Sequence, residues 1–164
     1  MASKKLLDLL KGYSNAMLCT HSPSIGIRAR PMHIANVEES GTVHFVTAAD
    51  SPKVAEIRYD GDVGITCQSG QCYVSASGKA KLLEDRKKIA ELYQKPWDAW
   101  FEGKDDPNIL LIRVEVDEAE YWDYSGTKGI RYLWKATKAA VSDDPKDKLD
   151  DKCPNNDAHA KVHL

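Results

Sequence analysis

The sequence has little excess charge of either sign, no long apolar run and few cysteines. Its 164 residues include 23 basic and 25 acidic side chains, which gives a formal net charge of −2. Nucleic acids and anionic membranes select basic surfaces, so neither is expected as a partner. No apolar stretch approaches the roughly 20 residues of a membrane-spanning helix. Asp8 interrupts the N-terminal apolar stretch too early for a signal peptide, so we expect a cytoplasmic protein.

Motifs of metal sites and of common catalytic centres are also missing. The spacing between Cys67 and Cys72 matches neither a CxxC redox motif nor a zinc knuckle. His159 and His163 have the spacing of metal ligands on a helix, but they lie in a polar segment. The sequence contains no GxSxG motif and no glycine-rich phosphate loop. We expect free thiols and no metal site, and no catalytic nucleophile stands out.

Short apolar or alternating segments, separated by turn residues, predict a mainly β protein. The expected strands cover residues 16–20, 27–37, 43–47, 63–68, 73–83, 109–116 and 120–123. Helices are expected at residues 3–12, 50–59 and 84–93, and later around Trp134. Strands and helices do not alternate regularly, which favours a closed or nearly closed antiparallel barrel. We assign the barrel domain to residues 1–141 and expect the polar tail, 142–164, to pack poorly.

The start of the expected helix at Ser51 has the features of an anion site. Ser51 is a candidate N-cap, Pro52 suits the first helical position and Lys53 lies in the first turn. Backbone N–H groups at a helix start, helped by a cation, bind phosphate. A lysine in the first turn is unfavourable with the helix dipole, so its presence favours an anionic partner.

Two arginines add positive charge to this region. Arg28 and Arg30 are two positions apart on an expected strand, so both point to the same face. If this strand pairs with the one that carries Thr47, the arginines and Thr47 can converge on Ser51 and Lys53. A phosphomonoester carries nearly two negative charges and accepts several charge-assisted hydrogen bonds. Ordinary surface charges and a common helix start would explain the same residues equally well.

Tryptophan is frequent for a chain of this length. The four tryptophans are Trp97, Trp100, Trp122 and Trp134. Core packing explains most of them best, because large aromatic side chains dominate the interiors of small domains. The alternative is that one or two of them cover a planar aromatic ligand.

A series of segments, taken in order, carries a resemblance to a known family. The segments are residues 28–32, 45–47, 51–57, 73–80, 99–107, 120–123 and 161–164. Together they resemble the flavin-binding split-barrel family related to pyridoxamine 5′-phosphate oxidase, and within it the general stress protein branch. The resemblance implies a six-stranded antiparallel split β-barrel, paired as a homodimer with two FMN sites at the subunit interface. FAD or a deazaflavin is an alternative cofactor.

The resemblance also implies roles for particular residues. The implied cofactor-binding residues are Arg28, Arg30, Met32, Val46, Thr47, Ser51, Lys53, Tyr73, Trp100 and Trp122. Of these, Thr47, Ser51 and Lys53 would hold the phosphate, in agreement with the anion site above. Trp122 would approach the flavin across the subunit interface, and the neighbourhoods of Tyr73 and Trp100 place them near it.

One departure from the oxidase limits the expected function. The oxidase has an Arg-x-His stretch after its tryptophan that grips pyridoxamine phosphate, whereas Asp123 and Tyr124 follow Trp122 here. Oxidation of pyridoxamine phosphate is therefore not expected. Three functions stay open: a flavin-dependent oxidoreductase of unknown substrate, a non-catalytic protein that sequesters or senses the flavin, or a barrel that binds haem, another planar ligand or nothing. The phosphate residues and the aromatic residues favour flavin binding.

Overall fold

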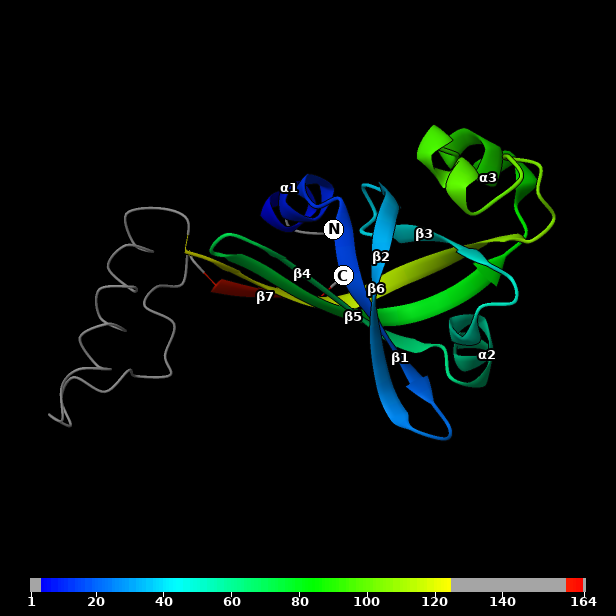
Figure 1. The fold of residues 1–164 in the computed structure, drawn as a ribbon. Helices are drawn as coiled ribbons and strands as arrows, with labels where there is room; N and C mark the ends of the chain where they lie inside the picture. The colour runs from blue at the N-terminus through cyan, green and yellow to red at the C-terminus, as the bar shows by residue number, and fades with distance from the viewer. Residues whose placement is uncertain (1–3, 125–158, 164) are drawn as a thin grey trace, which may run out of the picture.

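The computed structural model describes residues 4–124 and 159–163 (Figure 1). The helices are α1 (Lys4–Gly12), α2 (Pro52–Tyr59), α3 (Arg86–Leu92) and the 3₁₀ helix η1 (Lys95–Ala99). The strands are β1 (Asn15–Ser22), β2 (Gly26–Val37), β3 (Val43–Ala48), β4 (Asp62–Ser69), β5 (Cys72–Leu83), β6 (Ile109–Asp123) and β7 (His159–His163). The helix expected around Trp134 lies outside the described residues, as does most of the expected polar tail.

Six of the strands form a closed antiparallel barrel. They lie in the order β3-β2-β1-β4-β5-β6, and β3 also pairs with the first half of β6, which closes the sheet on itself. This architecture confirms the mainly β, six-stranded barrel that the sequence predicts. Among the described residues, no helix is long and apolar enough to cross a membrane, and no three potential metal ligands cluster. Cys19 and Cys67 are free thiols, as predicted.

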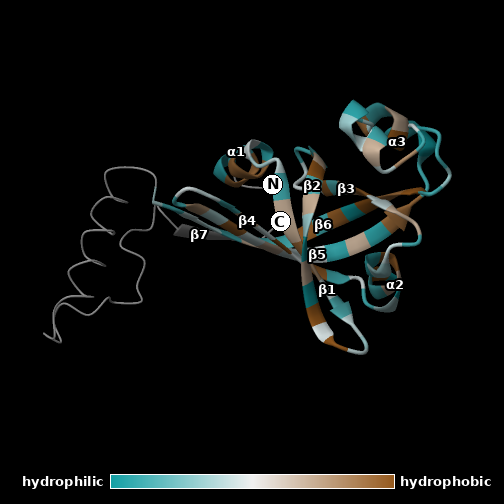
Figure 2. Cartoon of the chain, viewed as in Figure 1, coloured by the Kyte–Doolittle hydropathy of each residue, from teal (hydrophilic) through white to brown (hydrophobic). Residues whose placement is uncertain are grey.

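Alternating side chains build the core of the barrel. Apolar bands recur along the strands in Figure 2, because successive strand residues point to opposite faces of the sheet. The fully buried side chains of the main core include Leu6, Leu10, Leu18, Phe45, Ile65, Val74 and Ile112. Leu6 and Leu10 belong to α1, which packs onto the barrel. A second, smaller cluster attaches α3 to the sheet through Ile89, Ile109 and Leu111.

β6 is one strand of 15 residues where the sequence predicts two strands. The segment contains no glycine or proline that would end a strand. Its ladder with β5 shifts register between Ser77 and Gly78, so Asp117 is the extra residue of a β-bulge. A Cβ atom on Gly78 would lie 2.1 Å from the Glu115 carbonyl oxygen, so this close approach requires glycine. The bulge bends β6, whose first half pairs with β3 and whose second half pairs with β7.

The strand β7 lies in the segment for which the sequence predicts a poorly packed tail. Its residues pair antiparallel with the second half of β6, from His163 opposite Glu118 to His159 opposite Trp122. The edge of β6 beyond its ladder with β3 thus pairs with a segment that has little strand signal of its own, while the poor packing expected of the tail stays a prediction. The two histidines therefore lie on a strand, where their spacing is not that of helical metal ligands.

Candidate functional site

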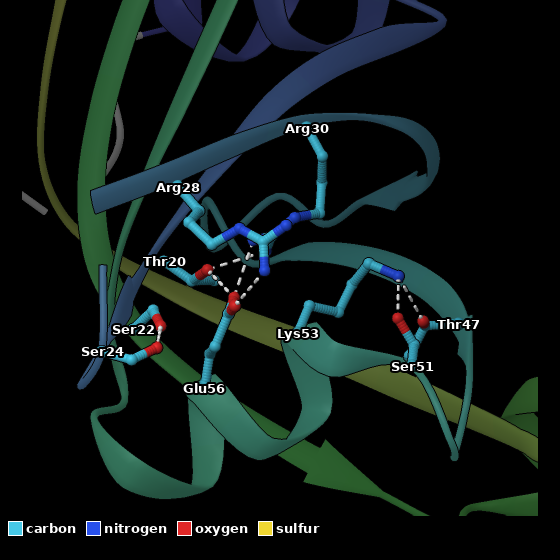
Figure 3. Close-up of polar contacts among 9 residues, drawn as sticks. All are labelled: Thr20, Ser22, Ser24, Arg28, Arg30, Thr47, Ser51, Lys53 and Glu56. Atoms are coloured by element: carbon cyan, nitrogen blue, oxygen red, sulfur yellow. Dashed lines mark hydrogen bonds and ion pairs between the residues drawn. The ribbon is translucent and has the colours of Figure 1, made fainter. Parts of the chain in front are cut away.

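The start of α2 brings together three of the predicted site residues. Ser51 has an extended backbone and Pro52 occupies the first turn, so together they determine where the helix begins. The Ser51 hydroxyl makes no capping bond to the helix and instead accepts a hydrogen bond from Lys53 Nζ. Lys53 Nζ also donates to Thr47 Oγ1 at 3.1 Å, as Figure 3 shows. We call Thr47, Ser51 and Lys53 the Lys53 cluster.

The ammonium group of Lys53 lies in surroundings that suit an anion. Burial lowers the pKa of Lys53, and the positive charge of Arg30 lowers it further, while the negative charges of Glu56 and Asp50 oppose the shift. A bound anion would stabilise the charged form of the lysine and would accept its hydrogen bonds. The electrostatics of the Lys53 cluster therefore favour a negatively charged ligand.

Arg28 and Arg30 reach α2 by a different route from the one that the sequence predicts. β2 and β3 do pair, but their ladder starts only at Ile34, and the arginines lie in the first half of β2, which pairs with β1. Arg28 lies opposite Thr20 in the ladder with β1. Both arginines contact Glu56 on α2, which confirms that they point to one face.

Glu56, the acidic partner of both arginines, was missed by sequence reasoning. Its side chain is only 6% exposed. Its carboxylate accepts hydrogen bonds from Thr20 Oγ1 at 2.5 Å, Arg30 Nη2 at 2.7 Å and Arg28 Nη1 at 3.2 Å (Figure 3). Burial disfavours the charged form, but the hydrogen bonds from Thr20 and Arg30 and the charges of the arginines outweigh it and hold the pKa of Glu56 below its usual value. Glu56 is therefore a buried, ionised carboxylate.

The sequence does contain a signal for Glu56. It follows Lys53 by three residues, so the two side chains lie on one face of a helix. It also lies between Val54 and Ile57, which are both buried against the barrel. Charged side chains are ordinarily expected at the surface, so sequence reasoning did not predict that Glu56 is buried.

Tyr73 and Trp122 form a separate pair at the far end of the β5–β6 ladder. They lie directly opposite each other, and Tyr73 is 38% exposed. Thr47, in contrast, lies opposite Leu110 at the start of β6. At about 3.3 Å per residue, Leu110 and Trp122 are separated by about 35–40 Å along the strand. One chain therefore does not bring Trp122 to the Lys53 cluster.

The remaining predicted residues lie apart from both groups. Met32 packs against the main core, and Val46 packs into the smaller cluster beneath α3. Trp100 follows η1 and is 74% exposed. The segment after it returns to the start of α2, where Ala49 N donates to Asn108 O at 2.8 Å. Cofactor contacts of Met32, Val46 and Trp100 stay predictions.

The barrel fold agrees with the family that the sequence resembles. The model of the family described as "Pyridoxamine 5′-phosphate oxidase like" matches residues 1–147, so the protein belongs to this family. General stress protein 26 of Bacillus subtilis (strain 168) is 28% identical over 120 residues, which cover 70% of this chain and 84% of that protein.

Two crystal structures extend the comparison. The general stress FMN/FAD binding protein of Xanthomonas citri is 29% identical, with a TM-score of 0.63, over 72% of this chain and 85% of that one. General Stress Protein 26 of Bacillus anthracis str. Sterne is 20% identical, with a TM-score of 0.65, over 72% of this chain and 91% of that one. At the lower identity the likeness shows the fold alone.

Proposed function

We propose that this protein binds FMN at the start of α2 and acts in the cytoplasm as a flavin-dependent oxidoreductase of the general stress protein type, with an unknown substrate. The observation that carries the proposal is the position of Lys53 Nζ, which donates to Thr47 and Ser51 at the beginning of a helix. The family match and the similarity to the general stress FMN/FAD binding protein of Xanthomonas citri support it.

The residues fit the phosphate end of FMN. A phosphate monoester carries nearly two negative charges and three strong acceptor oxygens. The Lys53 cluster offers an ammonium group and two hydroxyls at the start of α2, where Pro52 has no N–H and Val54 N already donates to Ser51 O at 2.9 Å. Bound FMN would supply hydride or electron transfer at its isoalloxazine ring. FAD and a deazaflavin are alternatives, but the two phosphates of FAD are joined to each other by an anhydride bond and each carries a single negative charge, so FAD lacks the terminal dianion that this cluster suits.

We further propose that a second copy of the chain supplies the aromatic side of the flavin site. Within one chain, Tyr73 and Trp122 are too far along β5 and β6 to share a ligand with Lys53. Exposed apolar side chains on the β1–β2 hairpin, Ile25 at 63% and Ile27 at 81%, offer a surface for association. A C2 homodimer with the flavin at its interface satisfies both observations. A monomeric mass in solution with FMN still tightly bound would exclude it.

Oxidation of pyridoxamine phosphate is not part of the proposed function. The sequence after Trp122 has no Arg-x-His stretch to grip that substrate, and Asp123 instead forms an ion pair with Lys5 at 2.6 Å. We therefore expect no formation of pyridoxal phosphate when the flavin-loaded protein is incubated with pyridoxamine phosphate.

Two titrations test the proposal. The first adds FMN, FAD and riboflavin to the apoprotein, and FMN is expected to bind more tightly than riboflavin. Equal affinities for FMN and riboflavin would show that the protein has no phosphate site. The second adds NADH or NADPH to the flavin-loaded protein without oxygen and follows the flavin absorption band near about 450 nm. Bleaching supports an oxidoreductase, whereas a bound flavin that neither donor reduces supports the non-catalytic alternative, a protein that sequesters or senses flavin.

A further inference from the structure

A single hydroxyl group joins an acidic and a basic side chain beside the Lys53 cluster. Thr20 Oγ1 donates to Glu56 Oε2 at 2.5 Å and accepts from Arg30 Nη1 at 2.7 Å. Arg30 Nη2 also donates to Glu56 Oε2, at 2.7 Å. The three side chains therefore close a ring of hydrogen bonds, which lies next to Lys53 in Figure 3.

This ring fixes the guanidinium group of Arg30. Its two terminal nitrogens are anchored on different elements, by Thr20 on β1 and by Glu56 on α2. Thr20 is 2% exposed and the Glu56 side chain is 6% exposed, so water competes little for these bonds. A guanidinium has five N–H donors, and the ring uses two of them, which leaves the others for a further acceptor.

A fixed cation binds an anion better than a mobile one. A long side chain loses rotamer freedom when it binds a ligand, and that loss opposes binding. Arg30 has already lost this freedom in the ring, and its charge acts on Lys53, whose pKa it lowers. A phosphate that reaches Lys53 therefore meets a second cation whose orientation is already set.

We propose that Thr20 and Glu56 are positioning residues that hold Arg30 beside Lys53, so that a phosphate monoester meets two ordered cations. This inference rests on the proposed binding of FMN to the same cluster. Thr20 and Glu56 act through Arg30 and not on the phosphate itself. Their contribution is therefore confined to ligands that carry the phosphate.

The sharpest test removes the Thr20 hydroxyl and leaves every charge in place, because a change of the Glu56 charge would also alter the attraction of phosphate directly. Thr20→Val replaces the hydroxyl with a methyl group of similar size, and Thr20→Ser keeps it. Quenching of flavin fluorescence measures the Kd of FMN and of riboflavin. Thr20→Val is expected to weaken FMN about five- to tenfold and to leave riboflavin within about twofold. Thr20→Ser is expected to restore the FMN affinity.

A double-mutant cycle with Arg30→Gln separates positioning from a general structural effect. If Thr20 acts through Arg30, Thr20→Val causes no further loss of FMN affinity once Arg30→Gln is present. An equal loss in both backgrounds would overturn the inference. An unchanged ratio of FMN to riboflavin affinity in Thr20→Val would overturn it as well.

A second variant keeps the inference testable if Thr20→Val does not fold. Glu56→Asp keeps the charge but shortens the side chain by one methylene, which draws the carboxylate away from Arg30. It is expected to weaken FMN selectively, again only when Arg30 is present. If the wild-type protein binds FMN and riboflavin equally, the proposed function itself fails. If the wild type prefers FMN and these variants keep the full preference, only the positioning role fails.

Discussion

The two ends of the β5–β6 ladder differ in how much of a binding site one chain provides. At the α2 end, the Lys53 cluster and the ring of Thr20, Arg30 and Glu56 are ordered within a single chain. At the other end, Tyr73 and Trp122 form one aromatic surface far from any of these groups. The difference indicates that the proposed phosphate site depends on one chain, whereas the proposed site for the flavin ring depends on two.

The largest expected effect breaks the α2 end. Glu56→Ala leaves Arg28 and Arg30 without their shared carboxylate, and loss of one partner of a buried ion pair lowers the free energy of unfolding by about 3 kcal/mol. Urea unfolding followed by circular dichroism measures this. Glu91→Ala is the control, because the Glu91 side chain is 67% exposed and its pair with Lys88 contributes at most about 0.5 kcal/mol. Equal losses of stability in the two variants would show that the Glu56 network contributes no more than an ordinary surface ion pair.

A smaller effect separates the two ends by their ligands. Lys53→Ala is expected to weaken FMN by about 1.5–3 kcal/mol, because a charged hydrogen bond to the phosphate is lost. Riboflavin has no phosphate, so its affinity is expected to stay the same. Lys87→Ala, which changes an exposed lysine on α3, serves as the control. Parallel losses for FMN and riboflavin in Lys53→Ala would show that Lys53 does not hold the phosphate.

Substitutions at Trp122 are expected to affect both flavins, whereas substitution of Lys53 is expected to affect FMN alone. Trp122→Ala removes a stacking surface worth about 0.5–1.5 kcal/mol and is expected to weaken FMN and riboflavin alike. The bound flavin is also expected to fluoresce more, since a stacked indole quenches it. Trp122→Phe keeps an aromatic ring and is expected to recover part of the affinity. Unchanged affinity and fluorescence in Trp122→Ala would contradict the role given to this residue.

The smallest effect is a dependence of stability on pH that comes from the α2 end. The pKa of Glu56 lies below its unfolded value of 4.5, so the folded state binds its proton less readily than the unfolded state. Its stabilisation is complete above pH 4.5 and is lost as the pH falls through the folded pKa, at no more than about 1.4 kcal/mol per pH unit. Denaturation midpoints at acidic pH are expected to fall less steeply in Glu56→Gln than in the wild type. Parallel slopes would exclude this contribution.

Local sequence signals predict the parts of the molecule that local contacts determine. The cap residue Ser51, the proline after it and Lys53 are neighbours in the chain, so their convergence follows from the start of one helix. The alternation of side chains likewise predicts the strands and the barrel. Arg28 and Arg30 share a face because of strand geometry alone, whichever strand lies beside them.

Features that depend on contacts between distant segments could not be predicted from the sequence. Glu56 is buried only because Thr20 and Arg30, from another part of the chain, supply its hydrogen bonds. The bulge at Asp117 arises from the ladder with β5, and β7 exists because β6 has an edge that β3 does not cover. Neither composition nor periodicity records such partners.

The extra residue at Asp117 also inverts the phase of β6. Before it, Val114 and Val116 are buried, so the even-numbered positions point to the core; after it, Ala119 and Tyr121 are buried, and the odd-numbered positions do so. Because side chains on a strand repeat every two residues, one inserted residue exchanges the inner and outer faces of everything downstream. Without the extra residue, the side chain of Trp122 would point into the barrel. The one extra residue in β6, Asp117, is thus the reason why the indole of Trp122 lies on the outer face of the barrel.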